Sequence, residues 1–245
     1  MLRMLRSEWL KIRGGLIWLL IGVSPIIAAL SGWLSSKEAG DGADGVVWLI
    51  ALSIMSALHA MLFLPLLTGV FSALVCRYEH ASGGWKQLLS LPVSRSQVYM
   101  TKFIVIMMLI GLVQLLFLAL LLLIGTVLDF GAPIPWAKLL ASIAGGWVAC
   151  LPLAALQLAV STAWASFAAP LALNVIFTIP NMLIANSAEY GPYYPWVQPM
   201  LAMIPSGEMT FGAFNVSAVT LFVIIGGSFL LFFVGGWSYF SRKPV

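Results

Sequence analysis

The sequence predicts an all-α integral membrane protein with six transmembrane helices in a single domain over residues 1–245. Of the 245 residues, 62% are hydrophobic and 8% are charged. Soluble domains carry about a quarter charged residues, so these few charges would not cover a soluble fold. Several apolar runs reach about 20 residues, the length that crosses a hydrocarbon core of ~30 Å. These observations exclude a soluble globular domain.

Six apolar segments have the length and composition of transmembrane spans. They are residues 16–34, 46–75, 103–128, 139–163, 167–186 and 216–240. The second segment is too long for a perpendicular crossing. We therefore expect it to be tilted or to extend beyond the membrane, with a bend at Pro65.

The basic residues are divided unevenly between the two sides of the predicted membrane. With the N-terminus inside, the outer loops keep only Lys37 and Lys138. The cytoplasmic side holds Arg3, Arg6, Lys11, Arg13, Arg77, Lys86, Arg95, Lys102, Arg242 and Lys243. This bias follows the positive-inside rule and predicts that both termini are cytoplasmic. It also accounts for the net charge of +4, so we expect no nucleic-acid partner.

Residues 1–14 form a separate element ahead of the first span. Leu2, Leu5, Trp9 and Ile12 recur at intervals of three and four, which places them on one stripe of a helix. Basic residues flank the stripe. The pattern predicts an interfacial helix along the inner leaflet. A positively charged start that only sets the topology is the alternative.

The longest polar interruption, YEHASGGWKQLLSLPVSRSQVY, covers residues 78–99 between the second and third spans. Gly83 and Gly84 allow a sharp turn, and Trp85 to Leu91 is a short helix candidate. Pro92 ends it, because the residue before a proline disfavours helix.

Ser94 suits the N-cap of the next helix, which we expect to run through Arg95 and Tyr99 into the third span. The short helix before it carries Trp85 and two leucines on one side. It would dock on a partner or lie on the membrane surface without one.

The outer segment 186–215 joins the fifth and sixth spans. It is apolar and aromatic, contains no Lys or Arg, and is interrupted by prolines. It is too broken to span and too apolar to extend freely into water. We expect it to re-enter the bilayer in part or to pack on the spans. Its acidic residues are Glu189 and Glu208.

The sequence lacks the common catalytic motifs. It contains no Gly-Lys dipeptide, hence no Walker A loop, and no HExxH or G-x-S-x-G motif. Cys76 and Cys150 fall at the end of one predicted span and inside another, so neither a disulfide nor a zinc site is expected. We therefore expect a non-enzyme with no catalytic residue, metal site or cofactor on this chain.

The predicted spans carry no Asp, Glu, Lys or Arg near their middle, which disfavours an ion-coupled secondary transporter. The polar residues that remain at depth are His59, Gln114, Gln157, Asn174 and Asn181. They are candidates for lining a translocation path. The alternative, and the commoner role of such residues, is hydrogen bonding between helices.

The inner loop also matches a family pattern, E-x₄-G-W-K-x-L-L-x-x-P in outline. The matching residues are Glu79, Gly84, Trp85, Lys86, Leu88, Leu89, Leu91, Pro92, Val93, Ser94, Arg95, Tyr99 and Lys102. With the basic N-terminal helix before it, the chain resembles the permeases of type-two ABC exporters. Within that class it most resembles lantibiotic-immunity permeases, which protect a producing bacterium from its own peptide. The resemblance covers the whole topology, but the motif is specific only over residues 71–102.

The resemblance implies a permease subunit in the bacterial plasma membrane. ATP and Mg²⁺ would bind to two separate cytoplasmic ATPase subunits, and a second permease, like or unlike, would pair with this one. The inner-loop helix would be the coupling helix that docks on the ATPase. The implied coupling residues are Glu79, Gly84, Trp85, Lys86, Leu88, Leu89, Pro92 and Arg95.

Individual roles follow from the same resemblance. Glu79 would receive or relay the ATPase movement through a salt bridge. Lys86 and Arg95 would pair with acidic ATPase groups or with lipid phosphates. Glu189 and Glu208 would attract a cationic peptide substrate.

Two other hypotheses stay open. The same architecture would serve a drug, another antibiotic or a lipid-like cargo. A non-transporting membrane sensor or assembly protein would use the inner loop to bind a regulator instead of an ATPase.

Overall fold

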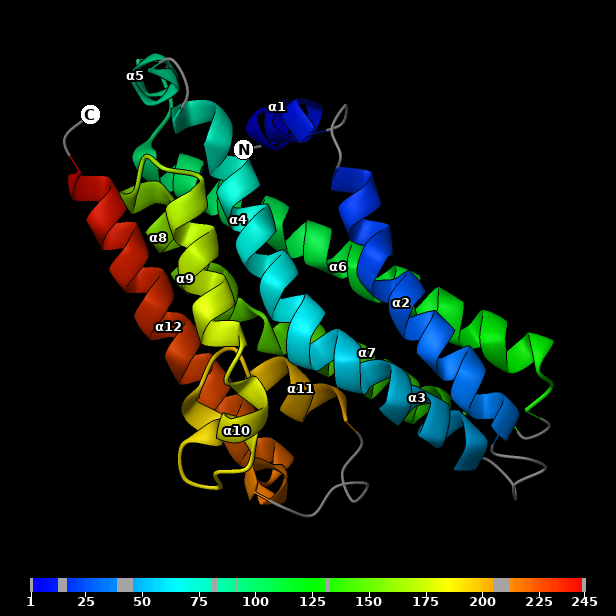
Figure 1. Ribbon diagram of the computed structural model, residues 1–245. Coiled ribbons are helices and arrows are strands. Elements are labelled where there is room, and N and C mark those ends of the chain that lie inside the picture. The colour runs from blue at the N-terminus through cyan, green and yellow to red at the C-terminus, as the bar shows by residue number, and fades with distance from the viewer. Residues whose placement is uncertain are drawn as a thin grey trace.

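The computed structural model describes residues 2–12, 17–38, 46–80, 83–90, 92–130, 133–204 and 212–243, and these residues form helices and connections without a strand (Figure 1). The elements are α1 (Leu2–Ile12), α2 (Ile17–Glu38), α3 (Val46–Leu58), the π-helix η1 (His59–Phe63), α4 (Leu64–His80), α5 (Gly84–Leu89), α6 (Arg95–Val127), α7 (Trp136–Ala149), α8 (Leu151–Ala163), α9 (Ala168–Thr178), α10 (Asn181–Ala185), the 3₁₀ turn η2 (Gly191–Tyr193), α11 (Gln198–Met203), the 3₁₀ turn η3 (Gly212–Asn215) and α12 (Ala218–Arg242).

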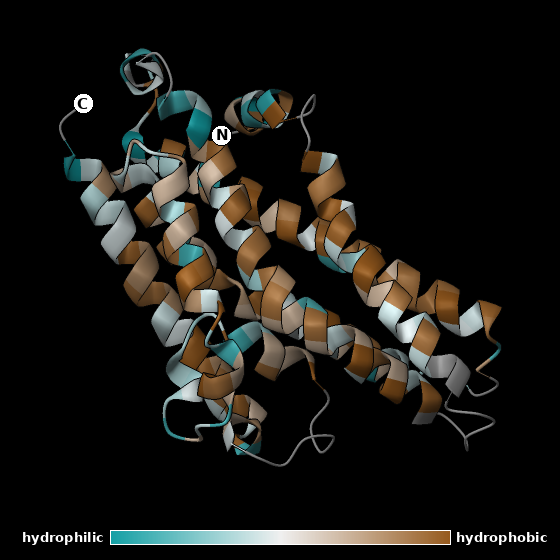
Figure 2. Ribbon diagram, viewed as in Figure 1, coloured by the Kyte–Doolittle hydropathy of each residue, from teal (hydrophilic) through white to brown (hydrophobic). Residues whose placement is uncertain are grey.

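Five helical stretches among the described residues are long and apolar enough to cross a membrane. They are Ile17–Ser35, Val47–His80, Arg95–Val127, Trp136–Ala163 and Ala218–Arg242. Hydrophobic residues extend along the bundle, and hydrophilic ones gather at the end that carries α1 and α5 (Figure 2). The protein is therefore an all-helical, multi-pass membrane protein, as the sequence predicts.

The predicted span 167–186 is shorter as a continuous helix than expected. α9 ends at Thr178, the chain turns at Ile179 and Pro180, and α10 begins at Asn181. Pro180 has no amide hydrogen to continue the helix. The six-span topology stays a prediction, because α9 is an apolar helix of 11 residues.

The predicted span 46–75 is part of one helix that continues to His80 through α3, η1 and α4. The π turn ends two residues before Pro65, whose missing N–H leaves the carbonyl of Met61 without its regular helical donor. Asn181 Nδ2 donates to that oxygen at 2.7 Å. A side chain from α10 thus satisfies the backbone group that the proline leaves free.

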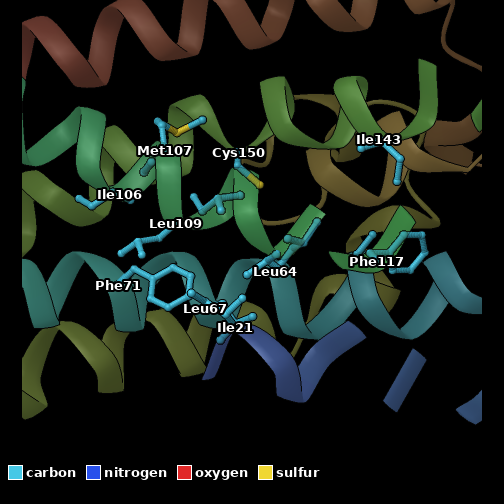
Figure 3. Close-up of a cluster of buried hydrophobic side chains, with 14 of the residues drawn as sticks. Ile21, Leu64, Leu67, Phe71, Ile106, Met107, Leu109, Phe117, Ile143 and Cys150 are labelled. Carbon is cyan, nitrogen blue, oxygen red and sulfur yellow. The ribbon is translucent and has the colours of Figure 1, made fainter. Parts of the chain in front are cut away.

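The core of the bundle lies where α4 packs on α6. Leu64, Leu67 and Phe71 of α4 lie beside Ile106 and Leu109 of α6, and all five are buried (Figure 3). α2 packs on both α6 and α3, and α8 lies between α4 and α12. Cys76 and Cys150, also in the interior, are both free, as expected.

The two ends of the bundle differ in construction. α1, α5 and the C-terminal end of α12 lie at one end, and α10 and α11 lie at the other (Figure 1). At the second end, Ser142 Oγ of α7 donates to the carbonyl of Met203 at 2.5 Å. A Cβ on Gly146 would lie 2.3 Å from Met203 Cγ, so this glycine allows α11 to pack closely. Within the segment 186–215, α11 thus packs on α7, and the depth of the segment in a bilayer stays a prediction.

Candidate functional site at the α5 end of the bundle

Four charged side chains from three helices meet at the end of the bundle beside α5. Glu8 and Lys11 belong to α1, Glu79 to the last turn of α4, and Lys102 to α6. Lys11 Nζ lies 2.5 Å from Glu8 Oε1 and 2.6 Å from Glu79 Oε1. Lys102 Nζ lies 3.1 Å from Glu8 Oε2 and 2.7 Å from Glu79 Oε2. Each carboxylate gives one oxygen to each ammonium, so the four groups form a closed, electrically neutral ring, here called the charge ring.

The charge ring is largely closed to solvent. The exposed fraction of the side chain is 1% for Lys102, 3% for Glu79 and 8% for Glu8, against 28% for Lys11. Lys102 Nζ also donates to the carbonyl of Val75 at 2.7 Å, which satisfies its third N–H. Burying a charge costs several kcal/mol unless partners compensate it. The ring therefore holds α1 against α4 and α6 only while all four charges are present.

The partly exposed member of the ring is stably protonated. Burial lowers the pKa of Lys11, but hydrogen bonds to Glu79 and Glu8 outweigh burial and raise this pKa above the ordinary 10.5. A lysine with a raised folded-state pKa contributes its stabilisation fully below the unfolded-state pKa and loses it as the pH rises through the folded-state value. The contribution of Lys11 is thus complete at neutral pH.

Two glycines place α5 directly over the end of α4. Gly83 has φ +71°, the left-handed conformation that glycine adopts without strain. A Cβ on Gly84 would lie 2.9 Å from both Glu79 Cα and the carbonyl oxygen of Tyr78. The short helix α5 begins at Gly84 and ends at Leu89, whereas the prediction was Trp85 to Leu91. Leu91 lies outside the described residues.

Trp85 connects α5 to the charge ring. Its indole centroid lies 5.5 Å from Lys102 Nζ, a cation–π distance, and 5.3 Å from the ring of Phe240 in α12. Its Nε1 donates to His80 Nδ1 at 3.2 Å, and His80 Nε2 donates to the carbonyl of Ser161 at 2.6 Å. These two bonds fix His80 as the tautomer with its proton on Nε2. α5 therefore contacts α4, α6 and α12 through one side chain.

The other residues implied in coupling lie in different surroundings. Leu88 is half-buried against the core, whereas Lys86 and Pro92 are exposed. The side chain of Leu89 lies outside the described part of the structure. Arg95 Nη1 donates to carbonyls at the end of α12, those of Phe240 (3.5 Å), Ser241 (3.4 Å) and Lys243. Arg95 thus has acceptors inside the chain, and its docking role stays a prediction.

Ser94 begins α6 as predicted. Its Oγ accepts from Gln97 N at 3.2 Å, and its own N–H donates to Gln97 Oε1 at 3.3 Å. This reciprocal capping box satisfies two amide groups at the helix start. α6 therefore begins at Arg95 and brings Lys102 to the ring two turns later.

His59 lies in the π-helix and joins three elements. Its Nδ1 lies 2.6 Å from Ser24 Oγ, and its Nε2 lies 3.2 Å from Gln114 Oε1. Because the amide oxygen of Gln114 accepts, Nε2 carries the proton and Nδ1 accepts from Ser24. The imidazole also stacks on Phe117 with ring centroids 4.4 Å apart. His59 and Gln114 are both fully enclosed by protein.

Asn174 is the centre of a second buried network. Its Oδ1 accepts from Gln157 Nε2 at 3.0 Å and Trp196 Nε1 at 2.8 Å. Its Nδ2 lies 3.0 Å from the carbonyl of Pro65 and 3.2 Å from that of Leu66. Asn181 donates to Trp196 O at 3.1 Å as well as to Met61. The five polar residues predicted at depth thus form interhelical hydrogen bonds, and a role in translocation stays a prediction.

The two acidic residues predicted to contact substrate are placed only in part. Glu189 is exposed in the connection between α10 and η2. Glu208 lies outside the described residues. Among the described residues, no second carboxylate therefore lies beside Glu189, and the predicted contact with a cationic substrate stays a prediction.

Sequence reasoning identified Glu79 as a salt-bridge residue but not the other ring members. Glu8 and Lys11 are three residues apart on a helix, a spacing that allows contact, and this was the available signal. The pairing of Lys102 with Glu8 joins residues 94 positions apart. One sequence contains no direct indication of such a contact.

Replacing Gly84 with alanine is expected to lower the free energy of unfolding by about 1 kcal/mol, because the added methyl meets the backbone of α4. Thermal unfolding in detergent measures the effect. Gly226→Ala is the matched control, since nothing lies within 4 Å of its Cβ position. Equal behaviour of the two variants would show that α5 does not need this close approach.

A sequence model of the ABC-2 family transporter protein matches residues 4–181, well over half of the chain. The matched residues include most of α1, all of α5 and the whole charge ring. No curated protein matches the chain. The family match and the membrane helices agree with the family resemblance of the inner loop. The chain therefore belongs to the ABC-2 family of transporter proteins, the membrane components of ABC transporters.

Proposed function

We propose that the chain is the permease subunit of an ABC exporter in which α5 transmits movement of a separate ATPase to the membrane helices. The observation that supports this most directly is the contact of Trp85 with Lys102 and His80. The end of the bundle with α1, α5 and the C-terminus is cytoplasmic in this proposal. The concentration of basic residues there supports that orientation.

The two faces of α5 have different roles in this proposal. Lys86 and Gln87 are exposed and contact the ATPase, where Lys86 pairs with an acidic group. Trp85 and Leu88 face the chain and transmit the displacement. Because the charge ring joins α1, α4 and α6, a displacement of α5 moves these helices together instead of separating them.

We further propose that the cargo is a lantibiotic-type antimicrobial peptide, expelled from the membrane for self-protection. The sequence WKQLLSLPVSR (residues 85–95) supports this cargo, as does the lack of charged residues near the middle of the predicted spans. A smooth apolar path suits an amphiphilic, membrane-bound substrate. Glu189, exposed on the outer side in this orientation, would attract its cationic groups.

Charge reversal on the exposed face of α5 tests the coupling proposal. Lys86→Glu is expected to weaken co-purification with the ATPase about tenfold, the scale of one charge-assisted contact. Trp85→Ala is expected to preserve co-purification and abolish cargo stimulation of ATP hydrolysis. Lys138→Glu is the control, because it reverses an exposed charge in the first turn of α7, away from α5. If both α5 variants match the wild type, α5 is not the coupling surface.

The cargo is tested separately in the reconstituted complex. Addition of a lantibiotic to proteoliposomes is expected to stimulate ATP hydrolysis, whereas a linear cationic peptide without lanthionine bridges is not. If only a drug or a lipid stimulates ATP hydrolysis, the proposed immunity role is wrong, but the assignment as a permease still holds. A complex in which no ATPase associates at all would instead favour a sensor or assembly protein.

A further inference from the structure

A pocket of about 210 Å³ lies between the ends of α4, α8 and α9, apart from the charge ring. Its lining includes Arg77 and His80 of α4, Ser161 of α8, and Phe167 and Pro170 at the start of α9. These helix ends lie at the same end of the bundle as α5 (Figure 1). The lining therefore combines one cation, hydroxyl groups and apolar surface at a membrane boundary.

The electrostatics of the pocket favour an anion. The Arg77 guanidinium lies over the Phe167 ring, 5.5 Å from its centroid, and is held at the pocket. α9 begins immediately after Phe167, and among the described residues no side chain caps the amide groups of Ala168 and Ala169. Pro170, the third residue of the helix, has no N–H. Free N–H groups and the helix dipole make such a helix start electropositive.

The end of α8 does not cancel this potential. Its last carbonyls would present partial negative charge, but each has a donor. His80 Nε2 donates to Ser161 O at 2.6 Å, and Lys243 Nζ donates to Thr162 O at 2.9 Å and Ala163 O at 3.3 Å. Among the described residues, no carboxylate lines the pocket.

An unpartnered hydroxyl points independently to a ligand. Ser161 is 1% exposed, and its Oγ has no hydrogen-bond partner among the described residues. The adjacent Thr162, by contrast, donates to Ala159 O at 2.9 Å within its own helix. A buried donor without an acceptor is costly. An oxygen of a bound anion would supply the acceptor.

We propose that this pocket binds the phosphate group of an anionic phospholipid. Arg77, the Ser161 hydroxyl and the start of α9 contact the phosphate, and Phe167 and Pro170 contact the apolar part of the lipid. Basic pockets between membrane helices at the cytoplasmic boundary suit lipid head groups. The site requires only the membrane location of the chain and is independent of the cargo and of the ATPase.

The test uses the purified, delipidated full chain in detergent. Dioctanoyl phosphatidylglycerol, dioctanoyl phosphatidylcholine and inorganic phosphate are added separately, and the rise in unfolding temperature gives the affinity of each. Phosphatidylglycerol is expected to bind and the other two are not. Arg77→Gln is expected to weaken phosphatidylglycerol binding about tenfold or more. Arg242→Gln removes an exposed cation outside the pocket and is expected to change nothing.

Ser161→Ala separates ligand binding from a structural role. Without lipid, the variant is expected to unfold at the same or a higher temperature, because it loses an unpaired buried group. With phosphatidylglycerol, its stabilisation is expected to be smaller than in the wild type. A lower unfolding temperature without lipid, together with unchanged lipid binding, would assign the hydroxyl to the fold and contradict the proposal.

Other results would overturn the lipid assignment. Equal stabilisation by phosphatidylcholine would show that the site does not select an anionic lipid. An equal loss of phosphatidylglycerol binding in Arg77→Gln and Arg242→Gln would show that the lipid does not bind in this pocket. Binding of inorganic phosphate alone, sensitive to Arg77, would identify a free anion as the occupant. If Arg77→Gln binds lipid normally but loses the ATPase, Arg77 belongs to the partner surface.

Discussion

Replacing Lys102 with methionine is expected to lower the free energy of unfolding by about 3–5 kcal/mol, the cost of leaving a buried charge without its partner. The substitution leaves Glu8 and Glu79 sharing only Lys11, which is the partly exposed member of the ring. Equilibrium unfolding in mixed micelles with increasing sodium dodecyl sulfate measures the change. Lys138→Met, at an exposed position, is the matched control and is expected to have little effect.

The double variant Glu79→Gln/Lys102→Met distinguishes a ring from two separate salt bridges. It retains the neutral pair Glu8–Lys11. It is therefore expected to be more stable than Lys102→Met alone, because no buried charge remains uncompensated. If the costs of the two single changes simply add, the four groups do not act as one unit.

Replacing Asn174 with alanine is expected to lower the free energy of unfolding by about 2 kcal/mol, at about 0.6 kcal/mol for each of the interhelical bonds lost. The change removes the acceptor of Gln157 and Trp196 and the donor to the carbonyls of Pro65 and Leu66. The same unfolding assay measures it. Asn186→Ala is the control, since Asn186 is exposed and, among the described residues, its side-chain amide donates to Met182 O, one turn back.

The Asn174 variant also tests the path hypothesis. If Asn174 serves only to hold helices together, transport per folded molecule is expected to stay at the wild-type level. If transport per folded molecule falls while Asn186→Ala transports normally, Asn174 lines the path of the cargo. Reconstituted protein, counted by its folded fraction, gives this measurement.

Local features of the fold follow from the sequence because they depend on neighbouring residues. Three such features depend only on residues within a few positions of one another: the amphipathic N-terminal helix, the short helix after Gly83 and the Ser94 cap. Apolar length predicts most of the spans in the same way. The break at Pro180 also has a signal in the sequence, since a proline inside a helical pattern indicates an end or a kink. The prediction of one span over residues 167–186 follows the apolar composition and ignores this proline.

The site was less predictable because its contacts join distant segments. The motif places Glu79, Trp85 and Lys102 in one stretch, but it does not say that Trp85 packs on the lysine of its own chain. Its apolar character predicts burial equally well against a partner. Likewise, the amides at Asn174 and Asn181 have no local feature that reveals which carbonyls they serve. Of those carbonyls, the one of Met61 lacks its regular helical donor because Pro65 has no N–H.

The π turn at His59–Phe63 determines the direction around the helix axis in which each later side chain of the long helix points. Each residue of an α-helix advances about 100° around the axis, and a π turn accommodates one extra residue within an otherwise α-helical course. α3 and α4 are thus out of phase by one position, although they form one continuous rod. A helical wheel drawn from α3 and extended at constant period would aim Glu79 away from Lys102. The phase offset, established in the interior, is what turns the carboxylate toward the lysine five helical turns later.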